Sequence, residues 1–186
     1  MKLYIKYMVS HRCKMVVKEE LQKLGLHPYH VELGAVNLPG ELSDDQKKQI
    51  AEALKRTGLE LLEDRRSILI EKIKSTIIEM IHLSEDQPKI NFSVYLSDKL
   101  NYDYTYLSNL FSESEGTTIE RYILLHKIEK VKELIIYGEL NFTEIAFRLH
   151  YSSVAHLSNQ FKKITGLTPS FFRSLKHKRR NQLENV

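Results

Sequence analysis

The sequence predicts an α+β module of about 64 residues followed by an all-helical region. Three observations predict this architecture. Strand and helix patterns alternate up to residue 64, every later pattern is helical, and the helical region repeats itself after 50 residues. A chain of 186 residues accommodates one large or two small domains. The apolar share of 42% and the charged share of 28% suit folded domains with a core.

The α+β module begins with a strand at residues 2–8, where apolar residues alternate with polar ones and tyrosines. Apolar residues then recur at helical spacing until Gly25, which ends the predicted helix. Residues 30–38 alternate again, and Gly34 interrupts them, which indicates two short strands or one bent strand.

The second half of the module repeats the helix–strand pattern. The capping box Ser43-Asp-Asp-Gln46 begins a helix that Gly58 ends, and residues 59–62 form a last short strand. The resulting order, β-α-β-β-α-β, is typical of a ferredoxin-like split sandwich over residues 1–64.

The helical region is predicted to extend over residues 65–180. Its first helix, of about 17 residues, carries an isoleucine stripe that either packs inward or forms a dimer seam. A connector at 84–89 follows. The stripe consists of Ile70, Ile73, Ile77 and Ile81.

The internal repeat is the most informative feature of the sequence. The segment Tyr106-Leu-Ser-Asn-Leu-Phe111 aligns with His156-Leu-Ser-Asn-Gln-Phe161, and a Gly follows each segment after five residues. Each copy is predicted to form a helix, a tight turn, a second helix and a Gly stop, which is the pattern of a helix-turn-helix. We place the two motifs at residues 92–115 and 142–165.

The second helix of the second motif is predicted to have a buried apolar face and an exposed polar face, within a positively charged segment. Ser152 is predicted to cap its second helix, and Leu157 and Phe161 are predicted to face the core. Residues 141–186 carry eight basic and two acidic side chains, whereas residues 90–140 have a net charge of −3. A dense positive segment suits a polyanion such as DNA.

A helix of about 20 residues is predicted between the motifs, from Ile119 to Tyr137. It would be about 30 Å long, close to the ~34 Å that separates successive major-groove faces on one side of B-DNA. A single chain is therefore expected to read two successive groove segments, as a monomer or a homodimer.

Residues 67–178 resemble the DNA-binding domain of the AraC/XylS-type bacterial transcription regulators. The resemblance lies in Glu144-Ile-Ala-Phe-Arg-Leu149, Leu157-Ser-Asn-Gln-Phe-Lys-Lys163 and Gly166-Leu-Thr-Pro-Ser-Phe-Phe-Arg173. It implies a sequence-specific regulator whose two second helices enter the major groove of double-stranded DNA. The first motif departs from the family pattern, because Phe111-Ser-Glu-Ser-Glu115 stands where basic residues are usual. We therefore expect the second motif to carry most of the DNA affinity, and the first either to read fewer bases or to contact a partner such as RNA polymerase.

Side-chain chemistry assigns the contacts within this interface. Amide, hydroxyl and imidazole groups read base edges, and cations bind phosphates. The predicted base-facing residues are Ser153, His156 and Asn159 in the second motif and Thr105, Tyr106, Ser108 and Asn109 in the first. The predicted phosphate contacts are Ser152, Lys162, Lys163, Arg173 and Lys176.

The N-terminal module resembles the heavy-metal-associated domains on the segment Met8-Val-Ser-His-Arg-Cys13, although Ser10 replaces the first cysteine of that loop. Cys13 with His11 is a candidate metal site, and the same cysteine is alternatively a thiol sensor or a small core residue. The alternative function is accordingly a metal- or thiol-sensing or handling protein whose helical region binds a protein partner.

Several classes are not expected. No glycine-rich phosphate loop or nucleophile motif is present, so neither an enzyme nor a cofactor is predicted. The single cysteine fits the cytoplasm, and no apolar run approaches the ~20 residues of a membrane span. Residues 181–186 are predicted to be a disordered tail.

Overall fold

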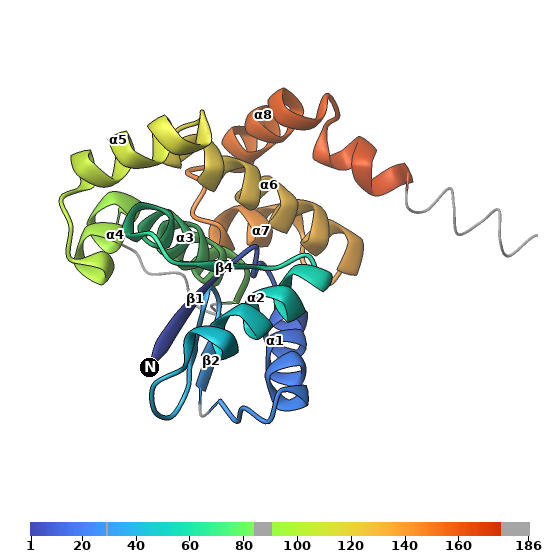
Figure 1. Cartoon of the computed structure of the whole chain (residues 1–186). Helices are drawn as coiled ribbons and strands as arrows, with labels where there is room; N and C mark the ends of the chain where they lie inside the picture. Colours follow the sequence, from blue (N-terminus) through green and yellow to red (C-terminus); the bar gives the residue numbers. More distant parts are fainter. Residues whose placement is uncertain (29, 84–90, 176–186) are drawn as a thin grey trace, which may run out of the picture. The chain divides into compact units, whose positions relative to one another are not determined.

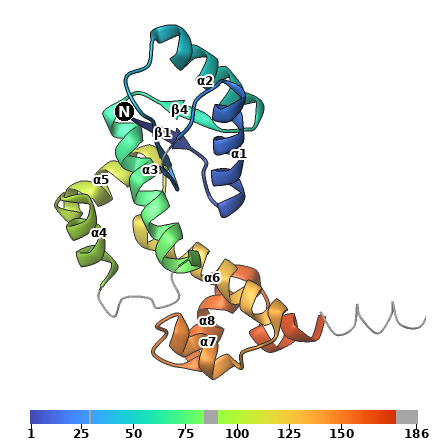
Figure 2. The same cartoon turned by 90° about the horizontal axis from the view of Figure 1, so that it is seen from below.

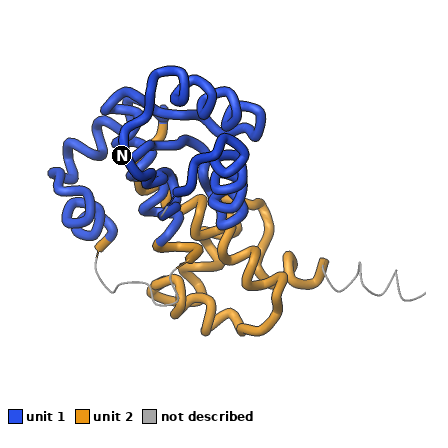
Figure 3. The backbone as a smooth tube through the Cα atoms, turned by 60° about the horizontal axis from the view of Figure 1, so that its bottom comes forward, with its two compact units in different colours: residues 1–79, 92–116 blue, residues 80–91, 117–186 orange. Residues whose placement is uncertain are grey.

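The computed structural model describes residues 1–28, 30–83 and 91–175. These residues form two compact units, one made from the described residues of 1–79 with 92–116 and one made from 80–83, 91 and 117–175 (Figure 3). The predicted connector at 84–89, the phosphate candidate Lys176 and the predicted tail at 181–186 lie outside the described residues. Among the described helices, none is long and apolar enough to cross a membrane.

The first unit begins with the predicted β-α-β-β-α-β order (Figure 1). The strands form one sheet in the order β2-β3-β1-β4, and all three neighbouring pairs are antiparallel. The segment around Gly34 is a hairpin of two strands, in which Gly34 has a φ of +75°. The elements are β1 (Lys2–Lys6), α1 (His11–Lys23), β2 (His30–Glu32), β3 (Ala35–Asn37), α2 (Asp44–Arg56) and β4 (Glu60–Leu62).

The two faces of the sheet have different partners. Leu3 and Ile5 of β1 are buried in a core with residues of α1 and α2, including Val17, Leu21 and Ile50. Since successive strand side chains point to opposite faces, Tyr4 and Lys6 lie on the other face. That face is covered by α3 (Arg65–Ile78), which lies between the sheet and the α4–α5 pair in Figure 2.

Helix α3 begins at a strong cap and ends in an irregular turn. The Asp64 carboxylate accepts hydrogen bonds from the backbone amides of Arg66 and Ser67, each at 3.0 Å. Beyond Ile78 the chain continues as a π-helical turn, η1 (Glu79–Leu83). All four residues of the isoleucine stripe are buried within the chain. The stripe therefore packs inward and does not form the dimer seam that the sequence left open.

The first helix-turn-helix belongs to the same unit as the sheet. It consists of α4 (Phe92–Leu100) and α5 (Tyr104–Glu115), at the predicted bounds. Asn101 takes a positive φ of 57° in the turn, a conformation that Asn adopts more easily than most residues. The Asp103 carboxylate then caps α5 by accepting from the amides of Thr105 and Tyr106.

The second unit contains the long helix and the second helix-turn-helix. Helix α6 (Ile119–Tyr137) has 19 residues, and α7 (Phe142–Arg148) and α8 (Val154–Thr165) follow. A further helical stretch covers residues 169–175. The core of this unit joins Ile128, Val131 and Ile135 of α6 to residues of the motif, including Ile145, Leu157 and Phe161.

One detail of the predicted local structure is wrong. Ser153, rather than Ser152, is the N-cap of α8, because its hydroxyl accepts from the His156 amide at 3.0 Å. Both serines precede the helix, and the chain turns at His150, which has a positive φ of 53°.

Candidate nucleic-acid interface

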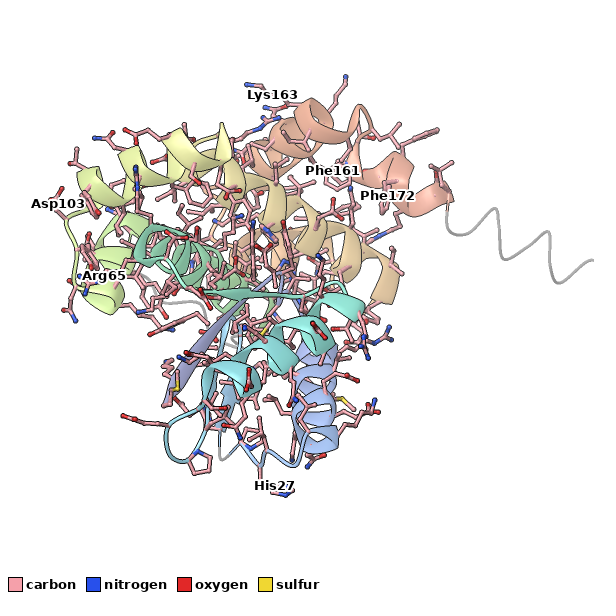
Figure 4. All side chains as sticks on the ribbon, viewed as in Figure 1. His27, Arg65, Asp103, Phe161, Lys163 and Phe172 are labelled. Carbon is pink, nitrogen blue, oxygen red and sulfur yellow. The ribbon has the colours of Figure 1, made fainter. Side chains whose placement is uncertain are left out.

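Helix α8 has an apolar face that is buried and a polar face that is exposed. Leu157 and Phe161 are fully buried, and the Phe161 ring meets the Phe172 ring edge-on at 5.6 Å between centroids. In Figure 4 these two rings lie between α8 and the helical stretch at 169–175, whereas Lys163 extends from the outer side of α8. Asn159, Lys162 and Lys163 are exposed, as a helix that reads a groove requires.

The first turn of α8 holds a histidine in a defined position. The His156 Nδ1 lies 3.0 Å from the Ser152 hydroxyl, and its ring meets the Tyr151 ring edge-on at 5.4 Å between centroids. Ser152 therefore orients the imidazole of His156 instead of capping the helix. The imidazole stays exposed, so its second nitrogen is available to a base edge or a phosphate.

Helix α5 of the first motif presents a different surface. Thr105, Tyr106 and Asn109 are exposed, and Ser108 is half-buried. The Tyr106 ring stacks on the Tyr102 ring, with 5.5 Å between centroids and 24° between planes. The structure thus brings together all four predicted residues of this motif on one helix, with an aromatic pair at its start.

The acidic groups of α5 are engaged within the first unit. Glu113 Oε2 accepts from Arg66 Nη2 at 2.9 Å, and Glu115 Oε2 lies 2.6 Å from Lys74 Nζ. Both cations belong to α3. The second pair is the more buried one, because the Lys74 side chain is 14% exposed. The carboxylates that distinguish this motif from the family pattern therefore anchor α5 to α3.

Helices α5 and α8 differ in charge. Helix α5 contains two acidic residues and no lysine or arginine, whereas α8 contains Lys162 and Lys163 and no acidic residue. Phosphate contacts dominate the affinity of proteins for DNA. The charge distribution thus favours α8 as the helix with the stronger electrostatic attraction.

Arg173, a predicted phosphate contact, faces the interior of the second unit. Its Nη2 donates to the Leu140 carbonyl at 2.9 Å, and its guanidinium lies 4.1 Å from the centroid of the Phe142 ring. The Arg173 Nε is buried. The structure gives this residue a packing role at the start of α7, and one of its five N–H donors is occupied by the Leu140 carbonyl.

Lys127 is a structural residue that the sequence reasoning missed. Its Nζ donates to the Leu149 carbonyl at 2.9 Å, at the C-terminal end of α7, and lies 5.4 Å from the centroid of the Tyr151 ring. Burial lowers the pKa of Lys127 and raises the pKa of Tyr151 to about 12. The two residues are 22 positions apart in the sequence, so no local pattern reveals this contact between α6 and the motif.

The described residues contain no group of three or more His, Cys, Asp or Glu side chains that could hold a metal ion. His11 and Cys13 lie in the first turn of α1, whereas His27 lies beyond the C-terminal end of this 13-residue helix, which is about 20 Å long. Figure 4 shows His27 at the tip of the loop that follows α1. The Cys13 Sγ lies 3.4 Å from the Ser10 hydroxyl. Burial acts to raise the pKa of the Cys13 thiol, but hydrogen bonds from Ser10 and nearby backbone groups lower it overall.

Comparison with known proteins identifies the helical region. Residues 96–174 match a family model described as a helix-turn-helix domain. This part of the chain is a helix-turn-helix domain that resembles those of AraC-type regulators. A transcriptional regulatory protein of Bacillus subtilis, YesN, is 30% identical over 151 residues, which are 77% of this chain and 41% of YesN.

Solved structures support the same assignment of the AraC-type domain. The C-terminal domain of AraT, a response regulator from Geobacillus stearothermophilus, is 26% identical with a TM-score of 0.51, over 60% of this chain and 88% of that domain. The DNA-binding domain of AdpA, a global transcriptional factor, was solved with a target DNA. It is 17% identical with a TM-score of 0.50, over 61% of this chain and 96% of that domain, and this likeness shows the fold alone.

The matched relatives are longer than this chain. The chain spans 41% of YesN and 13% of YtdP, another transcriptional regulator of Bacillus subtilis, to which it is 26% identical over 104 residues. Both relatives are named as transcriptional regulators.

Proposed function

We propose that this chain is a sequence-specific, double-stranded-DNA-binding transcription regulator that reads DNA through α5 and α8. The observation that supports the proposal most directly is the arrangement of α8. This helix exposes Asn159, Lys162 and Lys163 and buries Leu157 and Phe161 within an AraC-type domain. Amide and ammonium groups on one exposed helix face are suited to base edges and phosphates of the major groove.

Within this proposal α8 supplies most of the affinity and α5 reads fewer bases. The reason is electrostatic. The C-terminal part of α5 carries two carboxylates, which repel phosphates, whereas the C-terminal part of α8 carries two lysines, which attract them. Asn159 and His156 read bases, with Ser153 contributing a hydroxyl proton while it caps the helix. Lys162, Lys163 and Ser152 bind phosphates, and Lys176 extends this set beyond the described residues.

The proposal of two successive groove segments rests on the length of α6. Its 19 residues correspond to about 28 Å, somewhat less than the ~34 Å between successive groove faces. A bipartite site with half-sites about ten base pairs apart is the corresponding DNA sequence. RNA polymerase is the proposed protein partner, and the acting species is a monomer or a homodimer.

The N-terminal module is proposed to be a ferredoxin-like sensory or interaction module of residues 1–64, joined to a DNA-binding domain of residues 65–180. Its strand order and antiparallel pairing support that fold. Its likeness to heavy-metal-associated domains remains a prediction, since neither His11 nor Cys13 has a third ligand among the described residues.

The experiment that tests the proposed function is selection of random duplex DNA on the purified chain at about 150 mM salt, followed by sequencing. We expect enrichment of a motif with two half-sites, of which the stronger depends on α8. An Asn159→Ala variant should lose preference at one position of that half-site. A chain that enriches no sequence, with or without added metal ions, is not a DNA-reading regulator, and the metal- or thiol-handling alternative then takes its place.

A further inference from the structure

A cavity of about 550 Å³ lies within the first unit, between the sheet and the first helix-turn-helix. Four segments line it: the start of β1, the β2–β3 hairpin, one face of α3 and the α4–α5 turn. Small-molecule sites in proteins commonly have 300–1,000 Å³ and combine apolar walls with a few placed polar groups. The size of this cavity is therefore suited to a small ligand.

One face of α3 forms the longest wall. The lining positions recur every three or four residues, which places them in a single row along the helix. Arg65 is at one end of this row and Lys72 lies two turns further, about 10 Å along the axis. Ile68 and Leu69 lie between them, so the wall has a cation on each side of an apolar stretch.

The charge of the cavity is positive. Four cations and two carboxylates line it. Lys2 forms an ion pair with Glu32, and Lys99 with Glu79 at 3.1 Å, so these two cations are neutralised.

Two cations remain without a carboxylate. In the part of the chain that the structure describes, neither Arg65 nor Lys72 pairs with an acidic side chain. The Lys72 ammonium instead lies 4.7 Å from the centroid of the Tyr4 ring, on the floor of the cavity. Lys72 is half-buried, and a cation away from bulk water attracts an anion more strongly than an exposed one.

We propose that this cavity binds a small organic dianion, with one anionic group at Arg65, the other at Lys72, and an apolar body along Ile68 and Leu69. A guanidinium binds a carboxylate through two parallel hydrogen bonds, and an ammonium binds it as a point charge. The floor is held close to α3 at Gly34, where an added Cβ would lie 3.2 Å from the Ser75 hydroxyl. The ligand class is thus a dicarboxylate of moderate length.

The occupied cavity acts on the reading helix α5, an effect that rests on the proposed function. Asn101 and Tyr102 of the α4–α5 turn line the cavity. The Tyr102 ring stacks on Tyr106, which is a proposed base-facing residue. A ligand in contact with Tyr102 therefore changes the conformational freedom of the Tyr106 side chain. This in turn changes the base preference at the half-site that α5 reads.

The test is a titration of the full chain with adipate in 150 mM NaCl, without DNA, followed by amide NMR shifts. We expect saturable shifts at Gly34–Ala35, Arg65–Lys72 and Asn101–Tyr102, together with Tyr106, and at least tenfold weaker binding of hexanoate, the monoanion. The double variant Arg65→Gln/Lys72→Gln should weaken adipate binding at least tenfold. The charge-keeping variant Arg65→Lys/Lys72→Arg should stay within about threefold of the wild type.

A matched control excludes a general charge effect. Lys48→Gln/Lys55→Gln removes two charges from exposed positions on α2, away from the cavity, and should leave the affinity within twofold. Shifts that fail to saturate, or an equal loss of affinity in both Gln double variants, would overturn the proposal. Because this titration contains no DNA, the two proposals fail separately. Binding of adipate without binding of duplex DNA contradicts only the proposed function. Binding of duplex DNA without binding of adipate contradicts only the anion site.

Discussion

Replacement of Arg173 by Met separates a packing role from a phosphate role. Methionine keeps an unbranched apolar stem and removes the guanidinium. The hydrogen bond to the Leu140 carbonyl and the contact with the Phe142 ring are then lost. A hydrogen bond to a charged group contributes about 1.5–3 kcal/mol, and a cation–π contact about 0.5–2 kcal/mol. Since Arg173 is half-buried, we expect about 2–3 kcal/mol of lost stability in the second unit.

Hydrogen exchange measures this loss in the full chain. Because the chain has two compact units, a single unfolding transition is not assumed, and each unit is followed through its own amides. Amides of α7 and α8 should exchange roughly 30- to 150-fold faster in Arg173→Met, and those of β1 and β3 should be unchanged. The salt dependence of DNA binding should keep the wild-type slope, since no phosphate contact is removed.

The control for this prediction is Lys163→Gln, which changes an exposed side chain of the same unit. It should leave exchange rates unaltered, weaken binding to all duplex sequences alike and reduce the salt slope by about one. Unaltered exchange in Arg173→Met together with a slope reduced by about one would refute the packing role, and would restore this arginine to the phosphate contacts.

Three further variants test other parts of the structure. Asn159→Ala should relax preference at one base pair by about 1–3 kcal/mol in a competition assay, and equal weakening on all sequences would contradict base readout. Ser153→Ala removes the N-cap of α8 and should destabilise the second unit by about 1 kcal/mol, measured by α8 amide exchange, whereas Ser153→Asp should not. Burial raises the pKa of Glu71, which means that the folded state favours the protonated carboxyl. The protonated side chain therefore contributes to stability at low pH, and this contribution is lost as the pH rises through the raised pKa. Glu71→Gln should therefore be more stable than the wild type at pH 7 and equally stable at pH 4, by urea unfolding; an equal difference at both pH values would exclude titration of this carboxyl.

The elements of this fold were largely predictable because their signals are local. Helix ends depend on residues within one turn, such as the capping box at Ser43 and the glycines that end α5 and α8 in left-handed conformations. The motif bounds at 92–115 and 142–165 follow from such signals and from the repeat. The predicted cap Ser152 is wrong, and Ser153 caps α8 instead. The two serines are adjacent and have the same side chain, so the sequence alone does not tell which of them reaches the free amides.

The parts that were not predictable depend on contacts between distant residues. The partner of Glu113 is 47 positions away, and the Arg173 guanidinium reaches a carbonyl 33 positions away. Sequence patterns report the charge of a residue but not the direction in which its side chain points. The sequence therefore predicts a phosphate contact at Arg173 and repulsion of DNA at the acidic run of α5, but it does not reveal the Leu140 carbonyl or the cations of α3 that these side chains contact.

The division of the repeat between two compact units has a consequence for exchanging the two copies. The first copy shares its unit with the α+β module, and its carboxylates pair with Arg66 and Lys74 of α3. The second copy lies in the other unit and carries Lys162 and Lys163 near the same end of its second helix. Transplanting the second copy's Phe-Lys-Lys into the first would therefore add charge for DNA at the cost of the anchor to α3, so the two copies are no longer interchangeable.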